Sequence, residues 1–209
     1  MSSLVYYTQR DLCKDRLSDR EAYVLAVIAE HSPSLYKLEK LVDVPLATLW
    51  RAVKRLESLG YVLHSKRGTY EATVKGLLYL LVDEKVDFER AVNCIARRIS
   101  TSVEAARNVV KCLFNISDSV GLCVLDVIDN PRLLTKLALA KALEGKPLDR
   151  DFLGFIWGSI EALYPVKKVD NCEVIIVSDI KGPRILVGRC EREGFASNVA
   201  CPHVVSRAL

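Results

Sequence analysis

Basic side chains gather in one stretch of this chain, between Val44 and Leu81. Six lysines and arginines stand there against two glutamates, so the excess of four positive charges equals the net charge of all 209 residues. Positive charge concentrated on one segment is typical of a surface that binds phosphates. The candidate contact residues in this stretch are polar or cationic: Thr48, Arg51, Lys54, Arg55, His64, Lys66 and Arg67.

A second set of residues has the side chains of a metal site. Its members are Cys172, Cys190, Cys201 and His203. Zinc binds thiolates and imidazoles, but structural zinc sites usually pair their ligands as Cys-x(2–4)-Cys, and that spacing is absent. A disulfide, for example between Cys172 and Cys190 on facing strands, and free buried thiols are the alternatives. We therefore expect no cofactor, and because no nucleophile or acid–base set is apparent, no enzyme.

The basic residues of the first set need elements to position them. Pro45 suits the first turn of a helix, and Gly60 suits a left-handed helix end. Between them, apolar residues recur at helical spacing: Leu49, Val53, Leu56 and Leu59. This pattern predicts an amphipathic helix with its cations turned outward. Residues 61–64 and 69–74 then read as two strands around a basic turn.

Two further helices are expected before this segment. Ser18 and Glu21 form a capping box that opens a helix ending at His31, and Ser34 can cap another that ends at Val42. The order of elements is therefore three helices, a hairpin and a following helix that reaches Leu81.

This layout resembles the winged helix-turn-helix domains of prokaryotic MarR-, ArsR- and PadR-like regulators. The resemblance covers roughly residues 16–83. Its motif is Thr48-Leu49-x-Arg51-x-Val53-x-x-Leu56-Glu57-x-x-Gly60-Tyr61-Val62, then the basic hairpin and Thr73-Val74-Lys75-Gly76. In those families this helix enters the major groove of DNA, and the wing touches the backbone or the minor groove.

Carried over residue by residue, the resemblance implies specific contacts. Thr48, Arg51 and Arg55 would face the groove, while Lys66 and Arg67 would be wing contacts. Trp50 departs from the small or polar residue that is usual at its position. It could pack on the wing, stack on a sugar or lie in an interface.

The rest of the chain predicts two further regions. Residues 84–164 have a helical pattern throughout, with near-balanced charge, and five helices imply a bundle for dimerisation or effector binding. Four of these helices can open at Asp87, at Thr101 or Ser102, at Asn130, and at Asp149 or Asp151, and a short apolar helix is expected from Val120 to Ile128. Residues 165–209 include two apolar strands of a β-hairpin, 172–177 and 184–190, and a third extended segment is expected after them. The expected fold class is α+β and predominantly α, with boundaries at 1–83, 84–164 and 165–209.

Composition limits the location and the source. No run of 18 apolar residues appears, and the N-terminus lacks the pattern of a signal peptide, so we expect a cytoplasmic protein without a membrane span. Gln9 is the only glutamine and Met1 the only methionine, while charged residues are plentiful. This composition favours a thermophile, and we expect an archaeal source. Hyperthermophilic archaea form disulfides inside the cell, so the seven cysteines need not all be free thiols.

These observations predict a sequence-specific, DNA-binding transcriptional regulator that acts as a homodimer on double-stranded DNA, with an unknown small-molecule effector possible. The alternative is a winged helix that binds another protein within an archaeal replication, repair or transcription complex, with Trp50 as an anchor. Salt dependence separates the two, because DNA binding falls steeply with salt.

Overall fold

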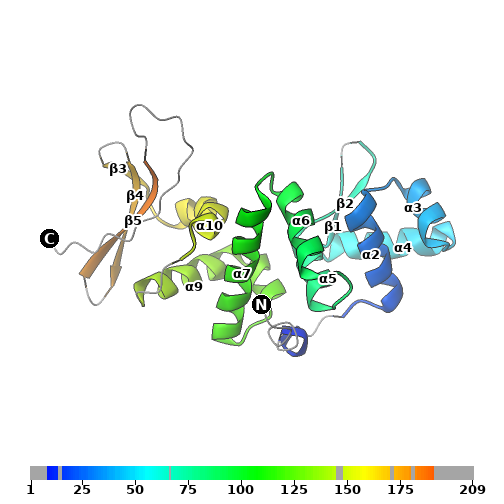
Figure 1. Ribbon diagram of the computed structural model, residues 1–209, viewed down its shortest axis with the longest axis horizontal. Helices are drawn as coiled ribbons and strands as arrows, with labels where there is room; N and C mark the ends of the chain where they lie inside the picture. Colours follow the sequence, from blue (N-terminus) through cyan, green and yellow to red (C-terminus); the bar gives the residue numbers. More distant parts are fainter. Residues whose placement is uncertain are drawn as a thin grey trace.

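The computed structural model in Figure 1 describes residues 9–13, 16–65, 67–144, 148–169, 172–179 and 182–190, with side chains as far as residue 176. These residues are mostly helical and include two small antiparallel sheets. The fold is therefore α+β and predominantly α, as the sequence predicts.

The N-terminal part consists of four helices and one hairpin. They are α2 (Asp19–His31), α3 (Leu35–Val42), α4 (Leu46–Ser58), β1 (Val62–His64), β2 (Tyr70–Ala72) and α5 (Val74–Val82). The predicted capping box at Ser18 is present, and Gly60 lies in the left-handed region with a φ of 75°. Pro45 stands one residue before the first turn, as the N-cap of α4.

The start of α5 differs from the prediction that the second strand reaches Val74. The strand ends at Ala72 because the Thr73 hydroxyl accepts a hydrogen bond from the Gly76 backbone N–H at 3.0 Å and caps a helix. The same hydroxyl donates to the Gly60 carbonyl at 2.7 Å. A Cβ on Gly76 would lie 2.3 Å from the Tyr61 carbonyl oxygen, so only glycine allows this close approach.

Five helices follow, as predicted. They are α6 (Phe88–Arg98), α7 (Val103–Val120), α8 (Val124–Asp129), α9 (Pro131–Leu143) and α10 (Arg150–Leu163). Their N-caps are also predicted residues: Asp87, Ser102, Asn130 and Asp149. The short helix predicted from Val120 to Ile128 is present as α8, but it begins at Val124, because α7 continues to Val120 and ends there at Gly121, which adopts a φ of 66°.

The C-terminal strands are β3 (Lys167–Val169), β4 (Cys172–Asp179) and β5 (Gly182–Cys190), in the antiparallel order β3-β4-β5. The predicted hairpin is confirmed, but the strands extend further than expected, because Asp179 pairs with Gly182. A third strand does exist, although it precedes the hairpin. The extended segment predicted after Cys190 lies outside the described residues.

The buried apolar side chains form one connected cluster that runs from Cys13 to Ile175. Figure 1 shows α3 and α4 at one end of the long axis and the three-stranded sheet at the other. Helix α5 packs against both α6 and α8, and nearly all of it is buried. Among the helices described, none combines the length and the apolar character that crossing a bilayer requires.

A short helical stretch at residues 9–12 docks on the α7–α8 junction, a contact that the sequence did not predict. A disulfide joins Cys13 to Cys123, which are 110 residues apart in the chain. The buried amide of Gln9 donates to the Asp118 carboxylate at 2.6 Å and accepts from the Val124 backbone N–H at 2.8 Å. The segment before α2 is thus fixed to the helices that follow α5.

Candidate nucleic-acid interface

Helix α4 separates its apolar and cationic side chains onto opposite sides. Its fully buried residues are Leu49, Val53 and Leu56. Arg51, Lys54 and Ser58 are exposed and lie three and four residues apart, so they form one stripe on the outer side of the helix. The folding of α4 onto its leucines therefore presents two cations and a hydroxyl together.

The two cations of this stripe differ in their partners. The Lys54 ammonium lies 2.8 Å from the Glu57 carboxylate one turn later, and this hydrogen bond and charge raise the pKa of Lys54. Arg51 forms no ion pair with any residue that the structure describes. Within the described part of the chain, Arg51 is thus the α4 cation without a carboxylate partner, so its whole guanidinium is available to a ligand.

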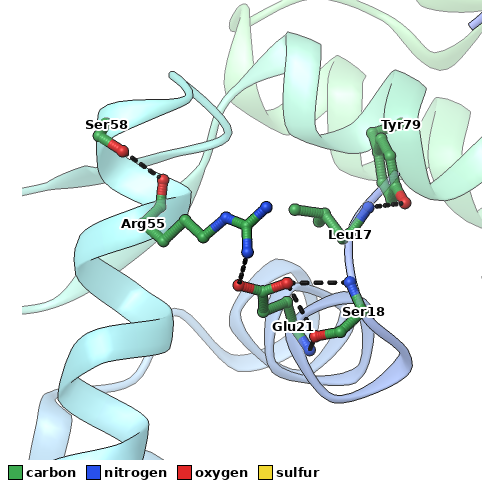
Figure 2. A network of polar contacts seen from close by, with 6 residues as sticks. All are labelled: Leu17, Ser18, Glu21, Arg55, Ser58 and Tyr79. Carbon is green, nitrogen blue, oxygen red and sulfur yellow. Dashed lines mark hydrogen bonds and ion pairs between the residues drawn. The ribbon is translucent and has the colours of Figure 1, made fainter. Parts of the chain in front are cut away.

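Arg55 is directed to the side of α4 that faces α2. Its Nη1 atom lies 3.2 Å from Oε1 of Glu21, and Figure 2 shows the side chain reaching across between the two helices. The second carboxylate oxygen of Glu21 accepts hydrogen bonds from the backbone N–H and the hydroxyl of Ser18. A residue predicted as a groove contact is therefore also part of the contact between α4 and the start of α2.

Burial alone would raise the pKa of Glu21. The hydrogen bonds from Ser18 and the positive charge of Arg55 together outweigh burial, so the pKa of Glu21 lies below its usual value. The carboxylate consequently keeps its charge at neutral pH. The capping box is visible in the sequence, but its ion pair with Arg55 is not, because the partner comes from another helix 34 positions later.

The remaining predicted contacts lie in the hairpin and in the first turn of α4. Arg67 and His64 are exposed, and the His64 ring lies 4.8 Å from the Tyr70 ring. Thr48 is half-buried. Lys66 lies outside the described residues. Arg67 has no ion pair within the described part of the chain, so both α4 and the hairpin turn carry an arginine without a carboxylate partner.

Hydrogen bonds within the turn fix its shape. The backbone N–H of Ser65 donates to the Thr69 carbonyl at 2.8 Å, and the two hydroxyls lie 2.8 Å apart. Gly68 adopts a φ of 77°, a conformation that few other residues take without strain. The predicted turn glycine is thereby confirmed, and the turn holds Arg67 at the end of the hairpin.

Lys75 contributes to the basic excess of residues 44–81, but it does not belong to the exposed cationic surface. Its ammonium donates to the Leu59 carbonyl at 2.8 Å, pairs with Asp129 of α8 and lies 4.9 Å from the centre of the Tyr61 ring. This lysine joins α5 to α8 and to the end of α4. The local charge count therefore overstates the positive charge available to a ligand.

Two large aromatic side chains are exposed close to these cations in the sequence. Trp50 on α4 is 50% exposed, and Tyr36 on α3 is 72% exposed. Exposed aromatic residues of this size are more frequent at binding surfaces than elsewhere on a monomer. They are thus further candidates for contact with a partner.

Metal binding finds no support in the described residues, where no group of three histidine, cysteine or acidic side chains could hold an ion. Cys201 and His203 lie outside that range. Cys172 is disulfide-bonded, and the backbone register places Cys190 opposite it. Cys94 and Cys112 are free thiols; burial raises the pKa of Cys112 to about 11, so at neutral pH it is a poor nucleophile.

Comparison with family models, with curated proteins and with solved structures gave no match to this chain. A function for this chain is therefore inferred from the geometry of the residues that the structure describes.

Proposed function

We propose that residues 18–82 form a winged helix-turn-helix that binds double-stranded DNA, and that the chain is a sequence-specific transcriptional regulator. In this proposal α4 is the recognition helix in the major groove. The hairpin of β1 and β2 is the wing, whose turn contacts the phosphate backbone.

The arrangement of the N-terminal elements supports this proposal. Helices α2, α3 and α4 pack together, and the hairpin follows α4 directly. An isolated bridge pairs Ser34 with Thr69, and the Tyr70 backbone N–H donates to the Pro33 carbonyl at 2.9 Å. The hairpin is thus fixed to the α2–α3 connection, so its turn has a defined position relative to α4.

The observation that carries the proposal is the pair of arginines on these two elements. Arg51 and Arg67 are exposed, and neither has a carboxylate partner within the described residues. No carboxylate among the described residues competes with a phosphate or a guanine edge for these two guanidinium groups, so all of their N–H donors are available. Arginine is well suited to both targets because its guanidinium donates two parallel hydrogen bonds.

The remaining parts of the molecule have roles in the same proposal. Affinity comes largely from lysine and arginine at phosphates, and sequence preference comes from Arg51 with Thr48 and Arg55. Residues 84–164 serve dimerisation or effector binding, and a symmetric dimer would place two recognition helices in successive major grooves. We place this regulator in the cytoplasm of a thermophilic archaeon.

The test is fluorescence anisotropy with labelled duplex DNA across a salt series. We expect the chain to bind with a steep salt dependence. Arg51→Ala should weaken binding to a selected duplex by about 1–3 kcal/mol and relax sequence preference. Lys66→Ala should weaken binding to all duplexes alike and reduce the salt slope by about one.

A matched control removes the same charge from another surface. Arg90 of α6 is exposed, but it pairs with Glu30 of α2. Arg90→Ala should leave DNA affinity nearly unchanged. Equal losses for Arg51→Ala and Arg90→Ala would mean that net charge alone drives binding, and the assignment of α4 as the recognition helix would then be wrong.

A protein-binding winged helix is the second candidate, and the exposure of Trp50 and Tyr36 favours it. Large aromatic side chains are frequent anchors of protein interfaces. Under this function Trp50→Ala would abolish partner capture, and binding would respond little to salt. Salt-steep DNA binding that survives Trp50→Ala would exclude Trp50 as the main anchor and support the DNA-binding function.

A further inference from the structure

One carboxylate joins the start of α2 to an exposed arginine of α4. Glu21 is 7% exposed, whereas the Arg55 side chain to which it pairs is 59% exposed. The carboxylate uses one oxygen for Ser18 and the other for Arg55, as Figure 2 shows. The buried partner is thus held from two directions, while the arginine it contacts remains accessible to a ligand.

The surroundings of this pair fix it further. The backbone N–H of Leu17 donates to the Tyr79 hydroxyl at 2.9 Å, which attaches the entry of α2 to α5. The Ser58 hydroxyl donates to the Arg55 carbonyl at 2.8 Å near the end of α4. These two hydrogen bonds hold the backbone on both sides of the pair, at the entry of α2 and in the last turn of α4.

We propose that Glu21 is a positioning residue for DNA binding: it holds the Arg55 guanidinium in the orientation in which that group contacts DNA in the major groove. This inference rests on the proposed DNA-binding function and assigns a role in it to an acidic residue. A single ion pair to Nη1 leaves the other guanidinium nitrogens of Arg55 available as donors. Fixing the side chain before binding reduces the conformational entropy that is lost when the complex forms.

The direction in which DNA affinity changes when Glu21 is neutralised separates this positioning role from a purely electrostatic one. Neutralising a carboxylate near a DNA-binding face makes that face more positive, so long-range attraction predicts tighter binding. If Glu21 positions Arg55, the same change loosens the guanidinium and weakens binding. The two effects have opposite directions, and the measurement needs no knowledge of the operator.

Glu21→Gln is the appropriate variant because glutamine also serves at the third position of a capping box. The hydrogen bond from Ser18 can thus be retained while the charge that holds Arg55 is lost. The matched control is Glu57→Gln, which removes an equal charge from the exposed pair with Lys54. Ser18→Ala is a second control: it removes the hydroxyl that caps α2, while the backbone N–H of residue 18 still donates to the Glu21 carboxylate that pairs with Arg55.

The experiment measures the affinity of each full-length variant for a random-sequence duplex at fixed salt, with thermal unfolding followed in parallel. We expect Glu21→Gln to weaken binding about two- to tenfold. Glu57→Gln should leave affinity unchanged or raise it. In an Arg55→Ala background, Glu21→Gln should have no further effect, because the residue acts through that arginine.

Several results would overturn the inference. Binding by Glu21→Gln that is as tight as that of the unmodified chain, or tighter, would show that only its charge matters. If Glu21→Gln still weakened DNA binding in the Arg55→Ala background, Glu21 would have only a structural role. The same would follow if Ser18→Ala weakened DNA binding as much as Glu21→Gln does. A chain that fails to bind DNA in a salt-dependent manner would overturn the proposed function and this inference with it.

Discussion

Two exposed arginines, Arg51 of α4 and Arg67 of the hairpin turn, differ from three arginines of α6 and α7 in what they contact. Arg51 and Arg67 have no ion pair among the described residues, whereas Arg90, Arg98 and Arg107 each pair with a glutamate of another element. The partners of the latter three lie on α2, β2 and α6. Among these five, the arginines of α6 and α7 join elements, whereas Arg51 and Arg67 face solvent; Arg55 of α4 does both, because it is exposed and pairs with Glu21 of α2.

This difference indicates that the N-terminal unit, residues 18–82, attaches to the rest of the chain on one side and is available to a ligand on the other. One side of it, through α5, β2 and the end of α2, is fastened to the helices that follow. The other side, with the outer stripe of α4 and the hairpin turn, makes few such attachments. We call these two sides the fastened side and the exposed face. Changes on the fastened side should reduce stability, and changes on the exposed face should affect binding.

The largest expected effect on the fastened side comes from the disulfide. Cys13→Ser opens a covalent link across 110 residues, and loss of such a bond typically costs about 2–5 kcal/mol of unfolding free energy. Chemical denaturation with and without reductant measures it. Reductant also opens the disulfide of Cys172, so the unmodified chain should lose at least as much stability under reductant as the variant loses without it. Cys94→Ser, which removes a free thiol, should change little.

The expectation would be wrong if Cys13→Ser lowered the free energy of unfolding by less than about 0.5 kcal/mol, which is roughly the scatter of surface substitutions. It would mean that residues 9–13 add nothing to the fastened side.

A smaller loss should follow when Gly76 of α5 acquires a side chain. Gly76→Ala places a Cβ 2.3 Å from the Tyr61 carbonyl oxygen, and relieving such overlap costs about 1–3 kcal/mol. Gly158→Ala in α10 is the control, because its Cβ would meet no atom within 4 Å, and alanine there should stabilise the helix by about 0.5–1 kcal/mol. Thermal or chemical unfolding compares the two. If both variants gained stability, the close contact between α5 and the end of α4 would be excluded.

The smallest expected effect on stability comes from removing a single arginine. Arg98→Ala removes the pair with Glu71, both of whose side chains are about one-third exposed, so the loss should be at most about 1 kcal/mol. Arg51→Ala should leave stability unchanged. DNA affinity should show the reverse order, with the loss confined to Arg51→Ala. The comparison would fail if the two variants changed stability and affinity in parallel.

Periodicity and capping residues were sufficient to predict most helices. Ser18, Asp87, Ser102 and Asp149 begin helices because their side chains accept hydrogen bonds from backbone N–H groups one turn later, a signal local to a few residues. Helix ends were harder to place. Two helices were expected around Gly121, but the boundary between them was placed too early: α7 runs on to Val120, where this glycine ends it.

Contacts between distant residues could not be predicted in this way. Nothing local marks Cys13 as the partner of Cys123. The charge count of residues 44–81 included Lys75, although its ammonium binds Leu59 and Asp129. The predicted site residues on α4 were found on one helix, but their partners come from other elements. Which arginine is paired and which is not is therefore information that only the tertiary structure provides.

The bond between Cys13 and Cys123 also turns the intervening chain into a closed covalent ring. Helices α2 to α7 and the β1–β2 hairpin all lie within it. A protease that cuts the exposed turn between Ser65 and Thr69 would leave both fragments attached, and they would separate on a denaturing gel only after reduction. Limited proteolysis of the native chain can therefore report the redox state of this bond through the number of bands.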